Sequence, residues 1–330
     1  MEKKFKVVIL NAPHPSFEIE RELLQDIADI DVVWCESSEE IVKVVSDVDG
    51  LMVADIPVLL TEEMMEKSER LKVISVYGVG TDRIDVKAAE RHGIVVTNAP
   101  DYGISEVADH TMALILSLIR KIHTFDKSFR EVGWARLRKN VTQVHEIAGE
   151  IHRLSTMNLG LIGFGRIAKA VAKRAKGFGF HIMAYDPYLS QDSFYGTSVQ
   201  KVDLDVLLRE ADIISIHTIL TDETRHMVGE NEINLMKKGV YLVNTSRGAI
   251  IDEKALTEAI VSRHIAAAAL DVFEREPLQT DDLLLHMSNV ILTPHIAWYS
   301  EESMENQKRE VALDTRKVLI GEAPIYPVSL

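Results

Sequence analysis

The sequence has little of several features that mark particular classes of protein. Its 330 residues include one cysteine, Cys35, so no internal disulfide can form, and we expect a reducing, cytoplasmic location. Lysine and arginine number 37 against 51 aspartates and glutamates, which argues against a nucleic-acid partner. No apolar run approaches the roughly 20 residues of a membrane span, so we expect no membrane partner. The apolar run after the basic start is also shorter than the roughly 7 to 15 residues of a secretory signal.

A chain of 330 residues has about the length of two domains. Its first part alternates β-branched runs with helical patterns. The predicted strands are residues 5–10, 31–34, 50–54, 72–76 and 94–97, and the predicted helices are residues 18–30, 38–45, 61–70 and 85–92. This alternation is typical of a parallel, doubly wound α/β sheet.

The second part repeats the pattern. A long, largely apolar helix is predicted at residues 105–123, and a polar stretch at residues 127–153 reads as irregular. A second strand-and-helix series then runs from residue 157 to about residue 290, and an amphipathic helix is predicted at residues 301–320. The sequence therefore predicts two α/β units.

A glycine-rich turn stands at the start of the second series. Gly163-x-Gly165-x-x-Ala168 follows a buried-strand pattern and precedes a strong helix-forming run at residues 166–176. In such a unit the first glycine makes the turn, the second lets the backbone approach a pyrophosphate, and the helix N-terminus offers free N–H groups. The glycine pattern alone also fits a plain structural turn, but the complete strand–turn–helix unit favours a dinucleotide site.

The next predicted strand, residues 181–186, ends in an acidic residue. Asp186 follows the turn by about 20 residues, where a carboxylate accepts hydrogen bonds from ribose hydroxyls. It would repel a 2′-phosphate, and no arginine stands beside it in Asp186-Pro187-Tyr188. We therefore expect NAD rather than NADP as the cofactor.

Polar residues stand at three further strand ends, where doubly wound folds bind their ligands. They are Arg247, the pair Asp271 and Glu276, and His295. Each has an ordinary structural explanation, such as a surface ion pair or a loop position. Their occurrence in one series beside one glycine turn favours a reaction site, since a guanidinium binds carboxylates and a histidine exchanges protons near neutral pH.

Together these stretches resemble the D-isomer-specific 2-hydroxyacid dehydrogenase family. The matching stretches are residues 160–168, Tyr185-Asp-Pro187, Leu242-Val-Asn-Thr-Ser-Arg-Gly248, Leu270-Asp-Val-Phe-x-x-Glu-Pro277 and Thr293-Pro-His295, preceded by Gly78-Val-Gly80 and Asn98-Ala-Pro100. The resemblance spans nearly the whole chain. Residues 184–189 and 295–300 are similar in particular to the branch that contains the C-terminal-binding protein corepressors.

The resemblance implies NAD-dependent interconversion of a 2-oxoacid and a D-2-hydroxyacid by hydride transfer. His295 is then the acid–base residue, Glu276 pairs with it, and Arg247 binds the substrate carboxylate. The implied substrate-binding residues are Arg247, Trp298 and the backbone of Val79 and Gly80. The implied cofactor-binding residues are Gly163, Gly165, Arg166, Ile167, Asp186, Thr218, Thr245, Ser246, Asp271, His295 and Trp298.

The resemblance also implies the domain organisation. Residues 1–104 and 299–330 form a flavodoxin-like substrate-binding domain, and residues 105–298 form a Rossmann NAD-binding domain inserted into it. A homodimer through the cofactor domains follows by family analogy. No metal is expected, since His145 and His152, seven residues apart, do not match the H-E-x-x-H pattern.

A few positions bear on the choice of substrate and on an alternative function, and one of them departs from the pattern of the family. Val76 stands where many members of the family carry a basic residue that suits a second anionic group, so phosphoglycerate is disfavoured as the substrate. The length of the chain disfavours it as well, because we expect that length to leave no room for a regulatory domain. Trp298 beside His295 favours an apolar or thioether side chain. The alternative is a binding protein of corepressor type, in which NAD(H) drives assembly with little turnover, since that branch keeps the same residues.

Overall fold

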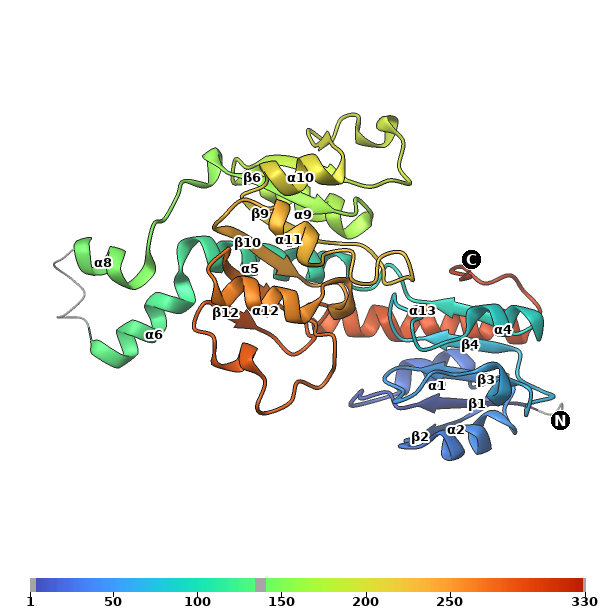
Figure 1. Ribbon diagram of the computed structural model, residues 1–330. Coiled ribbons are helices and arrows are strands. Elements are labelled where there is room, and N and C mark those ends of the chain that lie inside the picture. The colour runs from blue at the N-terminus through green and yellow to red at the C-terminus, as the bar shows by residue number, and fades with distance from the viewer. Residues whose placement is uncertain (1–3, 134–140, 329–330) are drawn as a thin grey trace. The chain divides into compact units, whose positions relative to one another are not determined.

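The computed structural model describes residues 4–133 and 141–328 (Figure 1). Contacts divide the chain into two compact units. Unit 1 comprises Met1–Gly103 and Tyr299–Leu330, and unit 2 comprises Ile104–Trp298. Among the helices in the described ranges, none is both long enough and apolar enough to cross a membrane.

Unit 1 is built on a five-stranded parallel sheet. Its strands are β1 (Phe5–Leu10), β2 (Ala28–Val33), β3 (Gly50–Val53), β4 (Val73–Val76) and β5 (Val95–Asn98), in the order β2-β1-β3-β4-β5. Its helices are α1 (Glu18–Leu24), α2 (Ser38–Val45), α3 (Glu62–Met65), α4 (Val86–Arg91) and α13 (Glu301–Leu319). This strand order is that of flavodoxin-like folds, and the inner strands are largely buried because helices cover both faces.

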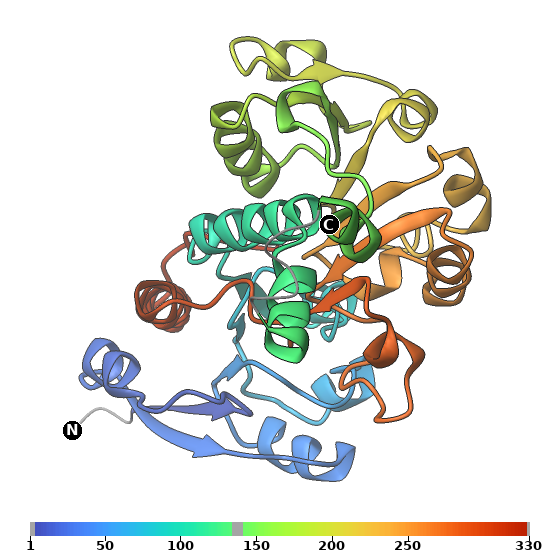
Figure 2. The ribbon, with the colours of Figure 1, turned by 90° about the vertical axis from the view of Figure 1, so that its left-hand side faces the viewer.

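The last helix of the chain belongs to unit 1. Helix α13 packs against α1 and against strands β3, β4 and β5, and it is seen nearly end-on in Figure 2. Its Lys308 Nζ donates a hydrogen bond of 2.8 Å to the Ser16 carbonyl, and Thr315 Oγ1 donates one of 2.8 Å to Ser75 Oγ. Buried polar bonds between distant parts of the sequence therefore close this unit.

Unit 2 is built on a seven-stranded parallel sheet. Its strands are β6 (Asn158–Ile162), β7 (His181–Tyr185), β8 (Gln200–Lys201), β9 (Ile213–Ile216), β10 (Val240–Asn244), β11 (Ile265–Leu270) and β12 (Val290–Leu292), in the order β12-β11-β10-β9-β6-β7-β8. Its helices are α5 (Ile104–Arg120), α6 (Ile122–Val132), α8 (Val141–Ala148), α9 (Arg166–Gly177), α10 (Leu204–Glu210), α11 (Glu230–Leu235) and α12 (Glu253–Val261).

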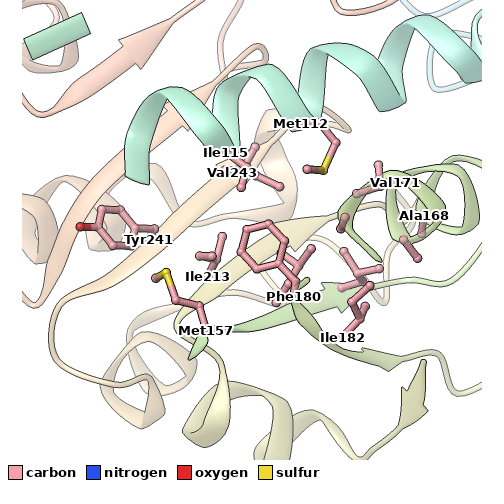
Figure 3. Packing of buried hydrophobic residues seen from close by; sticks show 14 of the residues in the cluster. Met112, Ile115, Met157, Ala168, Val171, Phe180, Ile182, Ile213, Tyr241 and Val243 are labelled. Atoms are coloured by element: carbon pink, nitrogen blue, oxygen red, sulfur yellow. The ribbon is translucent and has the colours of Figure 1, made fainter. Parts of the chain in front are cut away.

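The strand order of unit 2 reverses between β6 and β9, which is the switch point of a Rossmann fold. On one face of the sheet, α5 and α9 pack together over the strands (Figure 3). Met112 and Ile115 of α5 there meet Val171 of α9, Phe180 and the strand residue Val243. The predicted fold class, two doubly wound parallel α/β domains, is confirmed.

Two predictions of secondary structure are wrong over long stretches, and the helix predicted at residues 61–70 ends earlier, at Met65. The helix predicted at residues 18–30 ends at Leu24, and Ala28–Val33 is instead strand β2, because it pairs in parallel with the whole of β1. The stretch at residues 127–153 is not irregular throughout, since it contains part of α6 and all of α8. An ion pair of 2.8 Å between Asp126 and Arg130, four residues apart, supports α6 on its exposed side.

Candidate active site

The two glycines of the turn after β6 have different surroundings. Gly163 has a φ of +86°, and a Cβ there would lie 2.7 Å from the carbonyl oxygen of His217. Gly165 has a φ of −73°, and a Cβ there would meet nothing within 4 Å. The first glycine is thus required by the fold, whereas the second leaves open space at the N-terminus of α9.

The N-terminus of α9 suits an anion. No side chain caps it at Gly165, so its first backbone N–H groups are not satisfied by a cap, and Arg166 opens the helix. Ile167 is partly buried against the core, and Ala168 is fully buried, which keeps helix and strand close. The cradle residues therefore fit the pyrophosphate of a dinucleotide.

Asp186 directly follows β7 and holds two backbone groups. Its Oδ2 accepts the N–H of Phe164 at 2.9 Å, and its Oδ1 accepts the N–H of Tyr188 at 3.0 Å. The first bond ties the carboxylate to the glycine turn. Each carboxylate oxygen has a second lone pair, so the group can also accept ribose hydroxyls.

Three predicted cofactor residues line the ends of β9 and β10. Ser246 Oγ donates a hydrogen bond of 2.7 Å to the Thr218 carbonyl, which joins the two strand ends. Thr245 is buried, and its hydroxyl lies 2.9 Å from that of Thr111 on α5. These contacts fix the backbone from which Arg247 projects.

Asn244 is a site residue that the sequence reasoning missed. Its Oδ1 accepts the Ser246 N–H at 3.0 Å, and its Nδ2 donates to the Arg247 carbonyl at 2.9 Å. The side chain thus shapes the turn that presents Arg247, whose own Nη1 donates to the Ser246 carbonyl at 2.8 Å. The available signal was an asparagine at the end of a buried strand, just before a turn, where this residue favours side-chain to backbone bonds.

His295 and Glu276 form a close pair. The Nδ1 of His295 lies 2.8 Å from Oε2 of Glu276, and the other carboxylate oxygen accepts the Phe273 N–H at 2.9 Å. Burial alone raises the pKa of Glu276, but the hydrogen bond and charge of His295, together with the charge of Arg247, outweigh it and bring that pKa below its ordinary value. The structure thus brings the three residues of the predicted reaction site together.

Asp271 shapes the turn that carries His295. Its fully buried carboxylate accepts the N–H groups of Ile296 at 3.0 Å and Ala297 at 2.9 Å, and it accepts the Thr293 hydroxyl at 2.5 Å. This turn holds His295 at a φ of +54°, a conformation that few non-glycine residues adopt. Asp271 therefore acts on the geometry of His295, a role in addition to the predicted cofactor contact.

Two further predicted residues have contacts of their own. The indole Nε1 of Trp298 donates to the His295 carbonyl at 3.0 Å, which adds a second restraint to that turn. In unit 1, the Val79 carbonyl accepts the side chain of Asn98 at 2.7 Å, next to Gly78 with a φ of +146°. The roles of Val79 and Gly80 in binding a substrate carboxylate stay predictions.

A family model decides the relationship. The model described as D-isomer specific 2-hydroxyacid dehydrogenase, NAD binding domain, matches residues 112–297. The chain belongs to this family. The match lies within unit 2, so unit 2 is an NAD-binding domain and NAD is the cofactor. A likeness to the corepressor branch in particular stays a prediction.

Individual relatives agree with the family. The D-3-phosphoglycerate dehydrogenase of Methanocaldococcus jannaschii is 41% identical over 310 residues, which is 93% of this chain and 57% of the relative. That of Synechocystis is 38% identical over 300 residues, 91% of this chain and 52% of the relative. The chain thus spans little more than half the length of these curated relatives. The structure of Aquifex aeolicus D-lactate dehydrogenase with NAD and lactic acid is 32% identical, has a TM-score of 0.84 and matches over 96% of both chains.

Proposed function

We propose that this protein is an NAD-dependent oxidoreductase that interconverts a 2-oxoacid and a D-2-hydroxyacid. The observation that carries the proposal is the 2.8 Å pair of His295 and Glu276, in the same unit as Arg247 and the glycine cradle. A paired imidazole supplies a proton, a guanidinium holds a carboxylate, and the cradle holds a dinucleotide. Together these are the groups that reduction of a 2-oxoacid requires.

The chain's own residues handle the proton and the carboxylate. Bound NADH supplies the hydride. With Nδ1 directed to Glu276, His295 has Nε2 available to donate a proton to the substrate carbonyl oxygen, and in the reverse direction Nε2 takes the hydroxyl proton. Glu276 stabilises the charged ring and fixes its orientation. Arg247 binds the carboxylate and polarises the adjacent carbonyl.

Preference for NAD over NADP follows from Asp186. Its carboxylate is fixed beside the glycine turn by the N–H of Phe164 at 2.9 Å. A ribose with free hydroxyls can donate to it, whereas a 2′-phosphate would bring like charges together. We therefore propose tighter binding of NADH than of NADPH.

The substrate is proposed to be a small 2-oxoacid without a second anionic group. Val76 is buried in the core of unit 1 and brings no positive charge to the position at which the sequence resemblance expects a basic residue in many members of the family. Two curated relatives are named D-3-phosphoglycerate dehydrogenase, so phosphohydroxypyruvate is the competing substrate to be tested. Trp298, partly buried beside His295, favours an apolar or thioether side chain.

We also propose a homodimer formed through unit 2. Helices α6 and α8 extend away from the sheet of that unit (Figure 1). Helix α6 exposes Ile122 and Phe129, whose relative exposures are 55% and 43%. Exposed apolar side chains on a projecting element are typical of an interface. Light scattering should give twice the chain mass of 37.1 kDa.

The experiment is NADH oxidation over a panel of 2-oxoacids, from glyoxylate, pyruvate and hydroxypyruvate to phenylpyruvate, 4-methylthio-2-oxobutyrate and phosphohydroxypyruvate. A His295→Asn variant is the matched control, because asparagine tolerates the φ of +54° at this position. We expect turnover by the natural chain, and a variant that binds NADH but does not turn over. Tight NADH binding without turnover of any panel member would instead favour the assembly function.

A further inference from the structure

The loop that carries Glu276 rests directly on the loop that carries Arg247. A Cβ on Gly248 would lie 1.8 Å from the carbonyl carbon of Phe273 and 2.3 Å from the nitrogen of Glu274. The peptide between Phe273 and Glu274 therefore occupies the space of a side chain at position 248. This close approach sets the distance between the two loops, but packing against a glycine does not by itself fix the orientation of the peptide.

Two side chains outside the predicted site fix that orientation. The Oε2 of Glu253, the first residue of α12, accepts the Glu274 N–H at 3.0 Å. The Nε2 of His226 lies 2.8 Å from Oε1 of Glu274. Glu274 is thus held both by its backbone and by its side chain, two residues before Glu276.

Glu253 lies on the segment that continues the Arg247 loop, and His226 lies on a segment that pairs with it. The N–H of His226 donates to the Ala249 carbonyl at 2.9 Å, and Val228 forms a parallel bridge with Ile251. Glu253 follows these residues directly, at the start of α12 (Figure 1). One continuous group of contacts therefore connects the backbone after Arg247 with the backbone before Glu276.

The carboxylate of Glu253 is unfavourably placed for its own charge. Burial raises the pKa of Glu253, the Glu274 N–H lowers it, and the charges of Asp282 and Glu274 raise it again, so that the pKa lies above its ordinary value. Ionisable groups whose pKa is shifted by burial and by neighbouring charges are concentrated at functional sites. A role in holding the loop accounts for this placement.

We propose that Glu253 and His226 are positioning residues for the reaction, which fix the Phe273–Glu274 peptide so that Glu276 stays in contact with His295 at a set distance from Arg247. This inference rests on the proposed dehydrogenase function. Neither residue is assigned a contact with substrate or cofactor. Their effect passes through Glu276, so their loss should change the proton step and leave cofactor binding intact.

The test compares Glu253→Ala with Glu253→Gln in the full chain. The alanine variant removes the acceptor of the Glu274 N–H, so kcat should fall about tenfold to a hundredfold, since small misplacements of reacting groups have effects of that size. NADH affinity should stay within about twofold, because the change acts on Glu276 and leaves the glycine cradle and Asp186 as they are. Glutamine keeps an acceptor oxygen and should restore most of the rate.

Two further variants keep the test decisive. Glu258→Ala removes an exposed carboxylate from the same helix and should leave every parameter unchanged. His226→Asn keeps the φ of +54° but is too short to reach Glu274, and it should show a smaller fall in kcat with unchanged NADH affinity. If Glu253→Ala does not fold, His226→Asn tests the positioning role instead. That variant keeps the Glu253 acceptor of the Glu274 N–H and removes only the contact with the Glu274 side chain.

The outcomes separate this inference from the proposed function. An unchanged kcat in Glu253→Ala, beside an inactive His295→Asn, would overturn the positioning role and leave the dehydrogenase function standing. Equal loss of NADH binding and turnover in both Glu253 variants would show a general effect on the fold and would also overturn it. Absence of turnover in the natural chain would instead reject the dehydrogenase function.

Discussion

Substitutions of the two glycines in the cradle, Gly163 and Gly165, should have different effects, one on the stability of the fold and the other on cofactor affinity. Gly163→Ala places a methyl group 2.7 Å from the His217 carbonyl oxygen and forces alanine to a φ of +86°. The left-handed conformation costs about 1–2 kcal/mol, and crowding against the backbone adds about 1–3 kcal/mol. We expect the free energy of unfolding to fall by about 2–5 kcal/mol.

Gly165→Ala should behave in the opposite way. Its φ of −73° suits alanine, and its Cβ would meet nothing within 4 Å, so the loss of stability should be limited to the weaker N-cap, about 1 kcal/mol or less. The new methyl group would occupy the space that we assign to the pyrophosphate. NADH affinity should therefore fall at least about tenfold, which corresponds to about 1.4 kcal/mol.

Urea unfolding without cofactor and NADH fluorescence titration measure the two effects separately. Gly177→Ala, at the other end of α9 with open space around it, is the control and should leave NADH affinity unchanged. A Gly165→Ala variant that binds NADH as tightly as the natural chain would refute the placement of the pyrophosphate. A Gly163→Ala variant of natural stability would refute the steric argument.

Three further predictions concern selectivity and stability. Asp186→Asn removes the charge that excludes a 2′-phosphate, so the ratio of NADPH to NADH affinity should rise about tenfold or more, and an unchanged ratio would contradict this role. Burial lowers the pKa of His217 to about 4 from 6.5, so the folded state holds this ring neutral, and stability present above pH 6.5 should be lost as the pH falls towards 4. His217→Gln should lack this loss, at most about 3 kcal/mol, when unfolding by urea is compared at pH 7.5 and 4.5, and equal losses would disprove the assignment. The buried Asp314 accepts two backbone N–H groups of the C-terminal segment at 2.6 and 2.9 Å, so Asp314→Ala should destabilise by about 2–4 kcal/mol in thermal unfolding, whereas Asp26→Ala, which breaks an exposed ion pair, should have a much smaller effect.

The cradle could be predicted from the sequence because it is local. Residues 158–186 form a single strand–turn–helix–strand unit, so the order of residue types already encodes the turn at Gly163, the helix after Gly165 and the acid at its end. The reaction-site residues Arg247, Glu276 and His295 are far apart in sequence. The distances between them depend on contacts between loops that are remote in sequence, such as that of Gly248 with Phe273. The three residues could be grouped because parallel strands place their carboxyl ends at one edge of a sheet.

The sequence by itself determined the fold class, the cofactor turn and the residue types of the site, since periodicity and short-range spacing carry that information. Tertiary structure alone decided what the neighbours of those residues do. Residues 28–33 became a strand because β1 offers a pairing partner. Asp271 holds the His295 turn through backbone N–H groups some 25 residues away. Position 248 requires glycine because a peptide from the loop before Glu276 occupies the space of a side chain there. Hydrogen bonds and close packing depend on distances between segments remote in sequence, and these distances exist only after the chain has folded.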